Sequence, residues 1–394
     1  MRIRAKSFRQ TGKVLTCLMC LMALSGSEQS ILASQQTYET VVEEDMLAKM
    51  TLEEKVAQMF FITPEALTGV DQVTEAGEVT EAAFSEYPVG GMIYFAQNIK
   101  SREQISAMLE NMERISEERL RIPIFLAADE EGGQVSRLYG TVAGIPYIGD
   151  MYSIGAAGDS TKAWQIGQMI GNYMKELNFN VDFAPVADVF SNPENTVIGD
   201  RAFGSDPELV SEMVSMTVKG LQSEGVLATL KHFPGHGDTA EDSHSGYASS
   251  YKSLEELERC DFLPFRAGIE VDAAFVMAGH ISLPNVLNDQ TPASLSYEIV
   301  TEILRKKMQF NGIIITDALN MGAISQHYSS GEAAVMAVDA GVDMLLMPTD
   351  FYAAYEALLN AVQEGRISQE RINESVLRIL QTKEKMKEIC HADA

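Results

Sequence analysis

Short apolar segments alternate with longer amphipathic segments along most of this 394-residue chain. From about residue 56 onward, eight runs are rich in Val, Ile, Leu, Met, Phe or Ala; they cover residues 57–63, 89–95, 123–129, 181–188, 226–232, 273–280, 312–319 and 342–348. A strand that is buried on both faces has a continuous apolar sequence instead of an alternating one. The pattern therefore predicts eight strands of a buried, parallel sheet.

The segments between these runs have the polar and apolar periodicity of helices. The clearest of them cover residues 101–120, 206–225, 253–270 and 367–388. We expect Asp206 and Ser253 to cap the starts of the second and third helices, and Gly220 or Gly225 to end the second. Strands that alternate with helices, without a break in composition, predict an α/β fold with a single (β/α)8 TIM-type barrel. A doubly wound open sheet is the alternative, but no glycine-rich dinucleotide fingerprint follows the first predicted strand.

The N-terminal 36 residues differ from the rest of the chain. Five basic residues among the first thirteen precede an apolar run at 14–24, and small and polar residues follow at 25–34. This is the layout of a secretory signal peptide, and the run is short for a membrane span. We therefore expect residues 1–36 to be a signal peptide with a short linker, and residues 37–394 to be the barrel domain. An internal anchor is the alternative; the signal predicts export, to the extracellular space or a bacterial cell envelope.

The composition limits the classes of partner. With a formal charge of −26 and a pI of about 4.6, the protein should repel nucleic acid and anionic membrane surfaces. We expect a small-molecule partner, no nucleic acid, and no stable membrane span after signal removal. Only Cys260 and Cys390 remain beyond the predicted signal; a disulfide between them has no support in their spacing. The sequence does not indicate an oligomeric state.

Polar residues stand where several predicted strands end. They are Asp129, Asp188, Lys231 with His232, His280 and Asp317. In (β/α)8 barrels the active site lies at the C-terminal ends of the strands, so these side chains are expected to meet there. Asp317 alone could equally be a helix N-cap, but a carboxylate at the end of a rigid strand is also suited to act as a nucleophile.

The stretch KHFPGHGDTAEDSHSG, residues 231–246, holds three of the six histidines. Its Asp242 and His244 form a D-x-H pair, in which the carboxylate fixes the tautomer of the imidazole and makes a general acid/base. A surface hydrogen bond is the simpler interpretation. A metal site is the functional rival, with candidate ligands His232, His236, Asp238 and His244, although their spacings match no standard zinc signature.

Cations accompany the carboxylates. Arg137 follows Asp129 by eight positions, and Arg201 lies in VIGDRAFG. A carboxylate can bind two hydroxyls while Arg and Lys donate to others, so this set suits a polyhydroxylated ligand. Each residue could instead form a surface ion pair. The sequence has no aromatic and basic stripe of the kind that single-stranded nucleic acid needs.

Seven segments together resemble glycoside hydrolase family 3, and most closely its β-N-acetylglucosaminidase branch. They are MTLEEKVAQM, DEEGGQVSRL, FAPVADV, VIGDRAFG, KHFPGHGDTAEDSH, PASLS and ITDALNMGAI, and the resemblance covers roughly residues 45–385. It implies a retaining, exo-acting β-N-acetylhexosaminidase without a metal or cofactor. Asp317 would be the nucleophile and His244 the acid/base, oriented by Asp242. The residues that would hold the terminal sugar are Asp129, Arg137, Arg201, Lys231 and His232.

Two residues depart from the pattern of the family. Glu130 and Gln134 stand where a His or Gln and an Arg are more common, which affects the expected substrate preference and not the reaction. The substrate class would be cell-wall fragments such as muropeptides, chitin oligosaccharides or host glycans. Three alternatives remain: a β-N-acetylglucosaminide phosphorylase on the same site, a metal-dependent barrel hydrolase, and a sugar-binding protein without activity.

Overall fold

A computed structural model describes residues 43–239 and 248–391. The chain divides into two compact units, residues 1–50 and 51–394. Of the first unit, residues 43–50 are described, and residues 43–49 are helical. The predicted boundary between residues 36 and 37 lies outside the described residues. None of the helices within the described ranges has the length and apolar character needed to cross a membrane.

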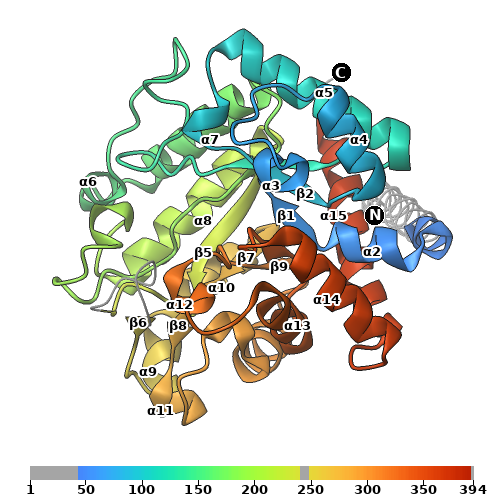
Figure 1. The fold of residues 1–394 in the computed structure, drawn as a ribbon. Coiled ribbons are helices and arrows are strands. Elements are labelled where there is room, and N and C mark those ends of the chain that lie inside the picture. The colour runs from blue at the N-terminus through green and yellow to red at the C-terminus, as the bar shows by residue number, and fades with distance from the viewer. Residues whose placement is uncertain (1–42, 240–247, 392–394) are drawn as a thin grey trace, which may run out of the picture. The chain divides into compact units, whose positions relative to one another are not determined.

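The second unit is built around a closed barrel of eight parallel strands, surrounded by helices (Figure 1). In chain order the strands are β1 (Phe60–Ile62), β2 (Gly91–Ile93), β3 (Phe125–Ala128), β4 (Val181–Asp182), β5 (Leu227–Phe233), β7 (Phe275–Ala278), β9 (Ile313–Thr316) and β10 (Leu345–Leu346). Each strand pairs with the next, β10 pairs with β1, and a parallel bridge between Ile315 and Met344 joins β9 to β10. The predicted (β/α)8 barrel is confirmed, and each of the eight apolar runs coincides with one of its strands, although β5 extends one residue beyond its run.

Helices follow the strands on the outside of the barrel, with short elements in the loops. The helices are α2 (Leu52–Gln58), α3 (Pro64–Thr68), α4 (Glu78–Glu86), α5 (Arg102–Leu120), α6 (Met151–Ala156), α7 (Ser160–Glu176), α8 (Pro207–Ser223), α9 (Leu254–Arg259), α10 (Phe262–Ile269), α11 (Pro284–Leu287), α12 (Gly322–Ser325), α13 (Ser330–Ala340), α14 (Phe351–Gln363) and α15 (Gln369–His391). The short elements are η1 (Ala96–Asn98), η2 (Gly199–Arg201), η3 (Ala293–Leu295), the π-helix η4 (Glu298–Lys307), and the strand pair β6 (Ala248–Ser249) and β8 (Ile281–Ser282).

Local sequence signals explain where these helices begin and end. The side chains of Asp206 and Ser253 accept hydrogen bonds from backbone N–H groups in the first turns of α8 and α9, as predicted. Of the two predicted stops, Gly225 follows the end of α8 with a φ of 86°. Gly220 instead lies within α8, where a Cβ atom would come 2.3 Å from the carbonyl oxygen of Trp164 in α7. The segment 253–270 forms two helices instead of one, divided at Cys260 and Asp261.

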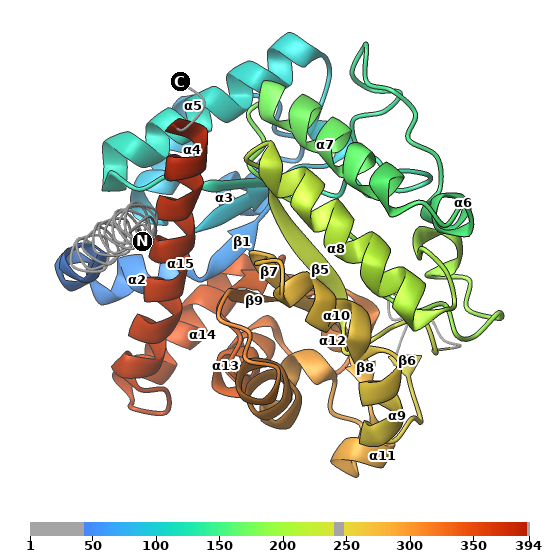
Figure 2. The same ribbon diagram turned by 180° about the vertical axis from the view of Figure 1, so that it is seen from behind.

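The last helix, α15, packs against the side of the barrel where the strands begin (Figure 2). Asp343, two residues before β10, is buried there and accepts hydrogen bonds from Ser375 and Arg378 of α15. It also pairs with Arg305 of η4 and accepts a hydrogen bond from the backbone N–H of Ile314 in β9. One buried carboxylate thus joins three elements at the closure of the barrel.

Candidate active site

The C-terminal ends of the strands enclose a cavity of about 350 Å³. Six of the eight residues predicted for catalysis or sugar binding line it, namely Asp129, Arg137, Arg201, Lys231, His232 and Asp317. They come from the ends of β3, β5 and β9, from the loop after β3, and from η2. Because parallel strands end at one rim, residues up to 188 positions apart in the sequence meet in one cavity. The volume lies within the range of small-ligand sites.

Asp129 links two of the cations in this cavity. Its Oδ1 atom accepts a hydrogen bond from Nζ of Lys231 at 2.9 Å, and its Oδ2 atom accepts one from Arg137 at 3.1 Å. The guanidinium of Arg137 also lies 5.3 Å from the centre of the Phe95 ring. The carboxylate of Asp129 and the ring of Phe95 thus hold Arg137 in place at the edge of the cavity.

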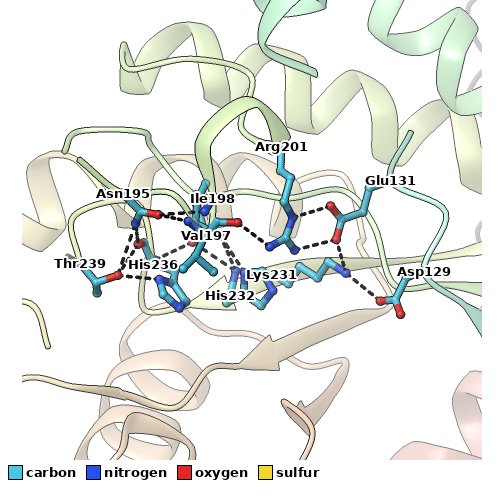
Figure 3. A network of polar contacts seen from close by, with 11 residues as sticks. Asp129, Glu131, Asn195, Val197, Ile198, Arg201, Lys231, His232, His236 and Thr239 are labelled. Atoms are coloured by element: carbon cyan, nitrogen blue, oxygen red, sulfur yellow. Dashed lines mark hydrogen bonds and ion pairs between the residues drawn. The ribbon is translucent and has the colours of Figure 1, made fainter. Parts of the chain in front are cut away.

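Glu131 belongs to the site but was not predicted from the sequence. Figure 3 shows it between Arg201 and Lys231. Its two oxygens accept hydrogen bonds from Nε and a terminal nitrogen of Arg201, each at 2.8 Å, and Oε1 lies 2.6 Å from Nζ of Lys231. Burial alone would raise the pKa of Glu131, but Lys231 and Arg201 outweigh burial and hold that pKa well below its ordinary value. Glu131 is therefore an ionised carboxylate between two cations.

Asp188, whose strand-end position was noted from the sequence, orients the first half of the histidine-rich stretch. Its Oδ2 atom lies 2.8 Å from Nδ1 of His232, and its Oδ1 atom accepts a hydrogen bond from the backbone N–H of His236 at 2.6 Å. Burial alone would raise the pKa of Asp188, but His232 and His236 hold it below its ordinary value. An ionised carboxylate only accepts hydrogen bonds, so Nδ1 of His232 carries the proton. The other ring nitrogen, Nε2, is left for the cavity that His232 lines.

His236 also lines the cavity, and its surroundings fix the backbone next to it. The hydroxyl of Thr239 lies 2.7 Å from Nδ1 of His236, and Asn195 donates a hydrogen bond to the carbonyl of His236 at 2.7 Å (Figure 3). Burial lowers the pKa of His236, and the neighbouring His232 adds to that effect. These contacts fix the loop that begins at His236.

Asp317 directly follows β9, and its backbone N–H donates to the carbonyl of Ala278 in β7 at 2.8 Å. Burial alone would raise the pKa of Asp317, but His232 and His280 outweigh it and hold that pKa below its ordinary value. His280, also noted at a strand end, contacts the carbonyl of Ala318 at 3.0 Å and the hydroxyl of Ser294 at 2.8 Å. Asp317 is thus a carboxylate that remains ionised on a rigid strand end, as a nucleophile requires.

The two departures noted in the sequence have separate roles. Glu130 accepts a hydrogen bond from the backbone N–H of Arg137 at 2.8 Å and one from the hydroxyl of Tyr173 at 3.0 Å. It fixes the segment that carries Arg137. Gln134 donates to Asp200 at 3.0 Å on the surface. These contacts belong to the architecture of the loop after β3, which agrees with assigning neither residue to chemistry.

Asp242 and His244 lie outside the described residues. The residues that flank this segment are described: Ser250 donates a hydrogen bond to Asp238 at 2.7 Å, and Lys252 pairs with the buried Asp261 at 2.8 Å. Over residues 43–239 and 248–391, no three His, Cys, Asp or Glu side chains are grouped so that they could hold a metal ion.

Comparisons with known proteins identify the family of this chain. Residues 51–382 match the model of the glycosyl hydrolase family 3 N-terminal domain. The chain is 35% identical over 327 residues to Beta-hexosaminidase A of Pseudoalteromonas piscicida, covering 77% of this chain and 54% of that protein. It is 31% identical to Beta-hexosaminidase LpqI of Mycobacterium tuberculosis, covering 84% of this chain and 82% of that one. The chain thus spans about half the length of the first relative and most of the second.

A solved structure is similar over the whole barrel. It is a glycoside hydrolase family 3 β-N-acetylglucosaminidase from Paenibacillus, with 37% identity and a TM-score of 0.81, covering 88% of this chain and 64% of that one. The resemblance inferred from the seven sequence segments is therefore confirmed by the family model, by curated relatives and by a solved structure. The protein whose barrel and site are described above belongs to glycoside hydrolase family 3.

Proposed function

We propose that this protein is a retaining, exo-acting β-N-acetylhexosaminidase that releases terminal β-linked N-acetylglucosamine. One observation carries the proposal: the ionised carboxylate of Asp317 shares a cavity with Asp129, Arg137, Lys231 and His232. A retaining glycosidase needs a carboxylate nucleophile next to groups that hold the hydroxyls of one sugar ring. The names of the relatives, beta-hexosaminidases, support N-acetylhexosamine as that sugar.

In the proposed reaction, a carboxylate oxygen of Asp317 bonds to the anomeric carbon as the glycosidic bond breaks. The electron pair of that bond goes to the departing oxygen, which His244 protonates. His244 then takes a proton from water, and the water oxygen displaces Asp317 from the anomeric carbon. Asp242 would orient the imidazole of His244. These two roles rest on the D-x-H sequence pattern and on the family resemblance.

Residues 1–36 support a further part of the proposal. A basic stretch and an apolar run at the start of the chain are typical of export, so the substrate would be a glycan outside the cytoplasm. Among the three candidate substrate classes we favour cell-wall fragments, including muropeptides, because an exported bacterial enzyme meets them directly.

A comparison of two chromogenic substrates tests the function. We expect the protein to release the aryl group from an aryl N-acetyl-β-glucosaminide at least about 100-fold faster than from the matching β-glucoside. Equal rates, or none, would contradict the proposal.

Product analysis in inorganic phosphate tests the phosphorylase alternative, because only phosphorolysis yields a sugar 1-phosphate. Activity that persists in a chelator would contradict the metal-dependent alternative.

A further inference from the structure

Two cations are buried next to each other in the candidate site, and they share one oxygen atom. Oε1 of Glu131 accepts a hydrogen bond from Arg201 at 2.8 Å and lies 2.6 Å from Nζ of Lys231. The side chains of Lys231, Glu131 and Arg201 are 3%, 2% and 13% exposed. Two buried cations repel each other, and each loses hydration, so their arrangement depends on the anion between them.

The contacts within the protein do not use all the N–H donors of Lys231 and Arg201. Lys231 has three N–H donors and uses two of them on Asp129 and Glu131. Arg201 has five; it directs two at Glu131 and one at the carbonyl of Val197, at 3.1 Å. Both cations line the cavity. Their remaining N–H groups are therefore held next to each other on a wall of the cavity, where a ligand with adjacent hydroxyls would accept from both.

We propose that Glu131 is a positioning residue, which holds Lys231 and Arg201 side by side as charged hydrogen-bond donors to the hydroxyls of the bound sugar. This inference rests on the proposed function for the identity of the ligand. The recognition of the sugar then depends on a residue whose carboxylate is occupied by two protein cations instead of by the sugar. Glu131 acts through Lys231 and Arg201, and its effect should appear in substrate binding more than in the chemical step.

The pKa of Lys231 distinguishes a positioning role of Glu131 from a purely structural one, because a purely structural role would leave this pKa unchanged. The charged and titratable groups around Lys231 are Asp129, Glu131, Arg201, Asp182 and Asp317. Burial alone would lower the pKa of Lys231, but Asp129 and Glu131 outweigh burial and the repulsion from Arg201, and raise that pKa above its ordinary value. Without the charge of Glu131, one of the two carboxylates that most strongly oppose burial and the repulsion from Arg201 would be lost, so the pKa of Lys231 should fall.

The test compares Glu131→Gln with wild type and with Asp200→Asn. Asp200 is adjacent to Arg201 in η2 and accepts a hydrogen bond from Gln134. Its substitution therefore removes a negative charge beside Arg201 but none of the hydrogen bonds of the two cations. For E131Q we expect KM to rise about 100-fold and kcat to fall less than about tenfold. The KM of E131Q should also begin to rise at a lower pH than the KM of wild type or D200N, because Lys231 loses its proton more easily in E131Q. E131D, which keeps the charge, should bring this rise back toward the pH at which wild type shows it.

A KM for E131Q within about threefold of wild type, without the pH dependence, would overturn the proposal. If E131Q does not fold, E131D still tests it: its carboxylate keeps the charge but is one methylene shorter, so its contacts with the two cations weaken, and KM should rise without a shift in its pH dependence. Turnover by wild type separates the proposed function from the proposed role of Glu131. An inactive wild type contradicts the proposed function but not the role of Glu131. In that case an NMR titration of the Lys231 side chain decides the role of Glu131, since it needs no substrate. An unchanged Lys231 pKa in E131Q would contradict that role.

Discussion

The imidazole of His232 and the carboxylate of Asp188 form a buried pair, with Nδ1 of the ring 2.8 Å from Oδ2 of the carboxylate. His232 lies near the C-terminal end of β5, and Asp188 lies in the segment after β4, so the pair joins two neighbouring strands on the rim that carries the site. Asp188 also accepts a hydrogen bond from the backbone N–H of His236, which leads into the D-x-H segment. One carboxylate thus orients both a cavity side chain and the backbone beside it.

Substitution of Asp188 should therefore impair the site more than an exposed carboxylate would. In Asp188→Asn, an amide N–H₂ replaces one acceptor and faces N–H donors, so His232 should lose its fixed tautomer and orientation. We expect kcat/KM to fall about 100-fold and the melting temperature to decrease. Asp71→Asn, at an exposed position, is the matched control. If both variants retain similar kcat/KM values, Asp188 does not orient His232 for function.

Asp317→Asn should abolish turnover and leave the fold intact. The amide oxygen of Asn can still accept the hydrogen bond that Oδ1 receives from the N–H of Ala318, but it cannot form the glycosyl ester. A fall in kcat on the order of 10³-fold or more is expected, at an unchanged melting temperature. Steady-state kinetics with the aryl N-acetyl-β-glucosaminide provides the measurement. Near-normal activity would show that another group is the nucleophile.

His244→Ala should slow the cleavage of poor leaving groups most. A good leaving group departs as an anion and needs little protonation, whereas a sugar alcohol needs a proton in the transition state. A series of aryl N-acetyl-β-glucosaminides with leaving groups of increasing pKa should give a steeper dependence of kcat/KM in the variant than in wild type. An equal loss for all members of the series would argue against the acid role of His244.

Lys383 should make stability depend on pH in a defined direction. Burial lowers its pKa to about 7 from an ordinary value of 10.5. Between these values the folded protein has lost a proton that the unfolded chain keeps, so the free energy of unfolding rises with pH, by up to about 1.4 kcal/mol per unit. Lys383→Met should remove this contribution. The stability of wild type relative to K383M should therefore increase from about pH 7.5 to about pH 9 in urea unfolding.

Lys387→Met is the matched control for this measurement, because Lys387 lies one turn further along α15 and pairs with Glu117 at the surface. K383M also leaves the Gln58 oxygen without the hydrogen bond from Lys383, at 2.8 Å in wild type. That loss adds a constant cost at every pH and does not change the slope. A difference between wild type and K383M that is the same at all pH values would contradict the lowered pKa.

Asp343→Asn should destabilise the barrel without a direct effect on the site. Asp343 pairs with Arg305 and Arg378, and loss of its charge leaves those partly buried guanidinium groups without this buried anion. We expect the free energy of unfolding to fall by about 3–5 kcal/mol. The folded fraction should retain its KM, since Asp343 lies before β10, at the end of the barrel opposite to the cavity. A raised KM with unchanged stability would contradict this separation of roles.

The sequence predicted the barrel well because its strands are buried on both faces, and this makes eight continuous apolar runs. It also placed Asp129, Lys231, His232 and Asp317 correctly at strand ends, since each is a polar residue at or near the C-terminal end of such a run. The split between α9 and α10 was not predicted: the periodicity of residues 253–270 continues across the break at Cys260 and Asp261. Periodicity alone does not register a change of helix axis.

Glu131 and Asp343 were missed for a shared reason. In the sequence, Glu131 is one of three consecutive acidic residues, and such a run is normally solvated. Asp343 was included in the apolar run 342–348 and had no motif to distinguish it. Their partners Arg201, Arg305 and Arg378 come from distant segments, so tertiary structure alone brings the charges together. The one available signal for Glu131 in the sequence was its position two residues after Asp129, at the end of a predicted strand.

The pairing of β10 with β1 affects the order in which the site is completed during synthesis. Phe60 of β1 is paired with Leu345 of β10, so 284 residues must be made after the first strand residue before its partner exists. Leu346 and Met347, at the end of β10, also form part of the cavity wall. Asp129, Lys231 and Asp317 therefore leave the ribosome before the residues that complete the wall of their cavity. In a nascent chain the cavity is complete only after the last strand has been added.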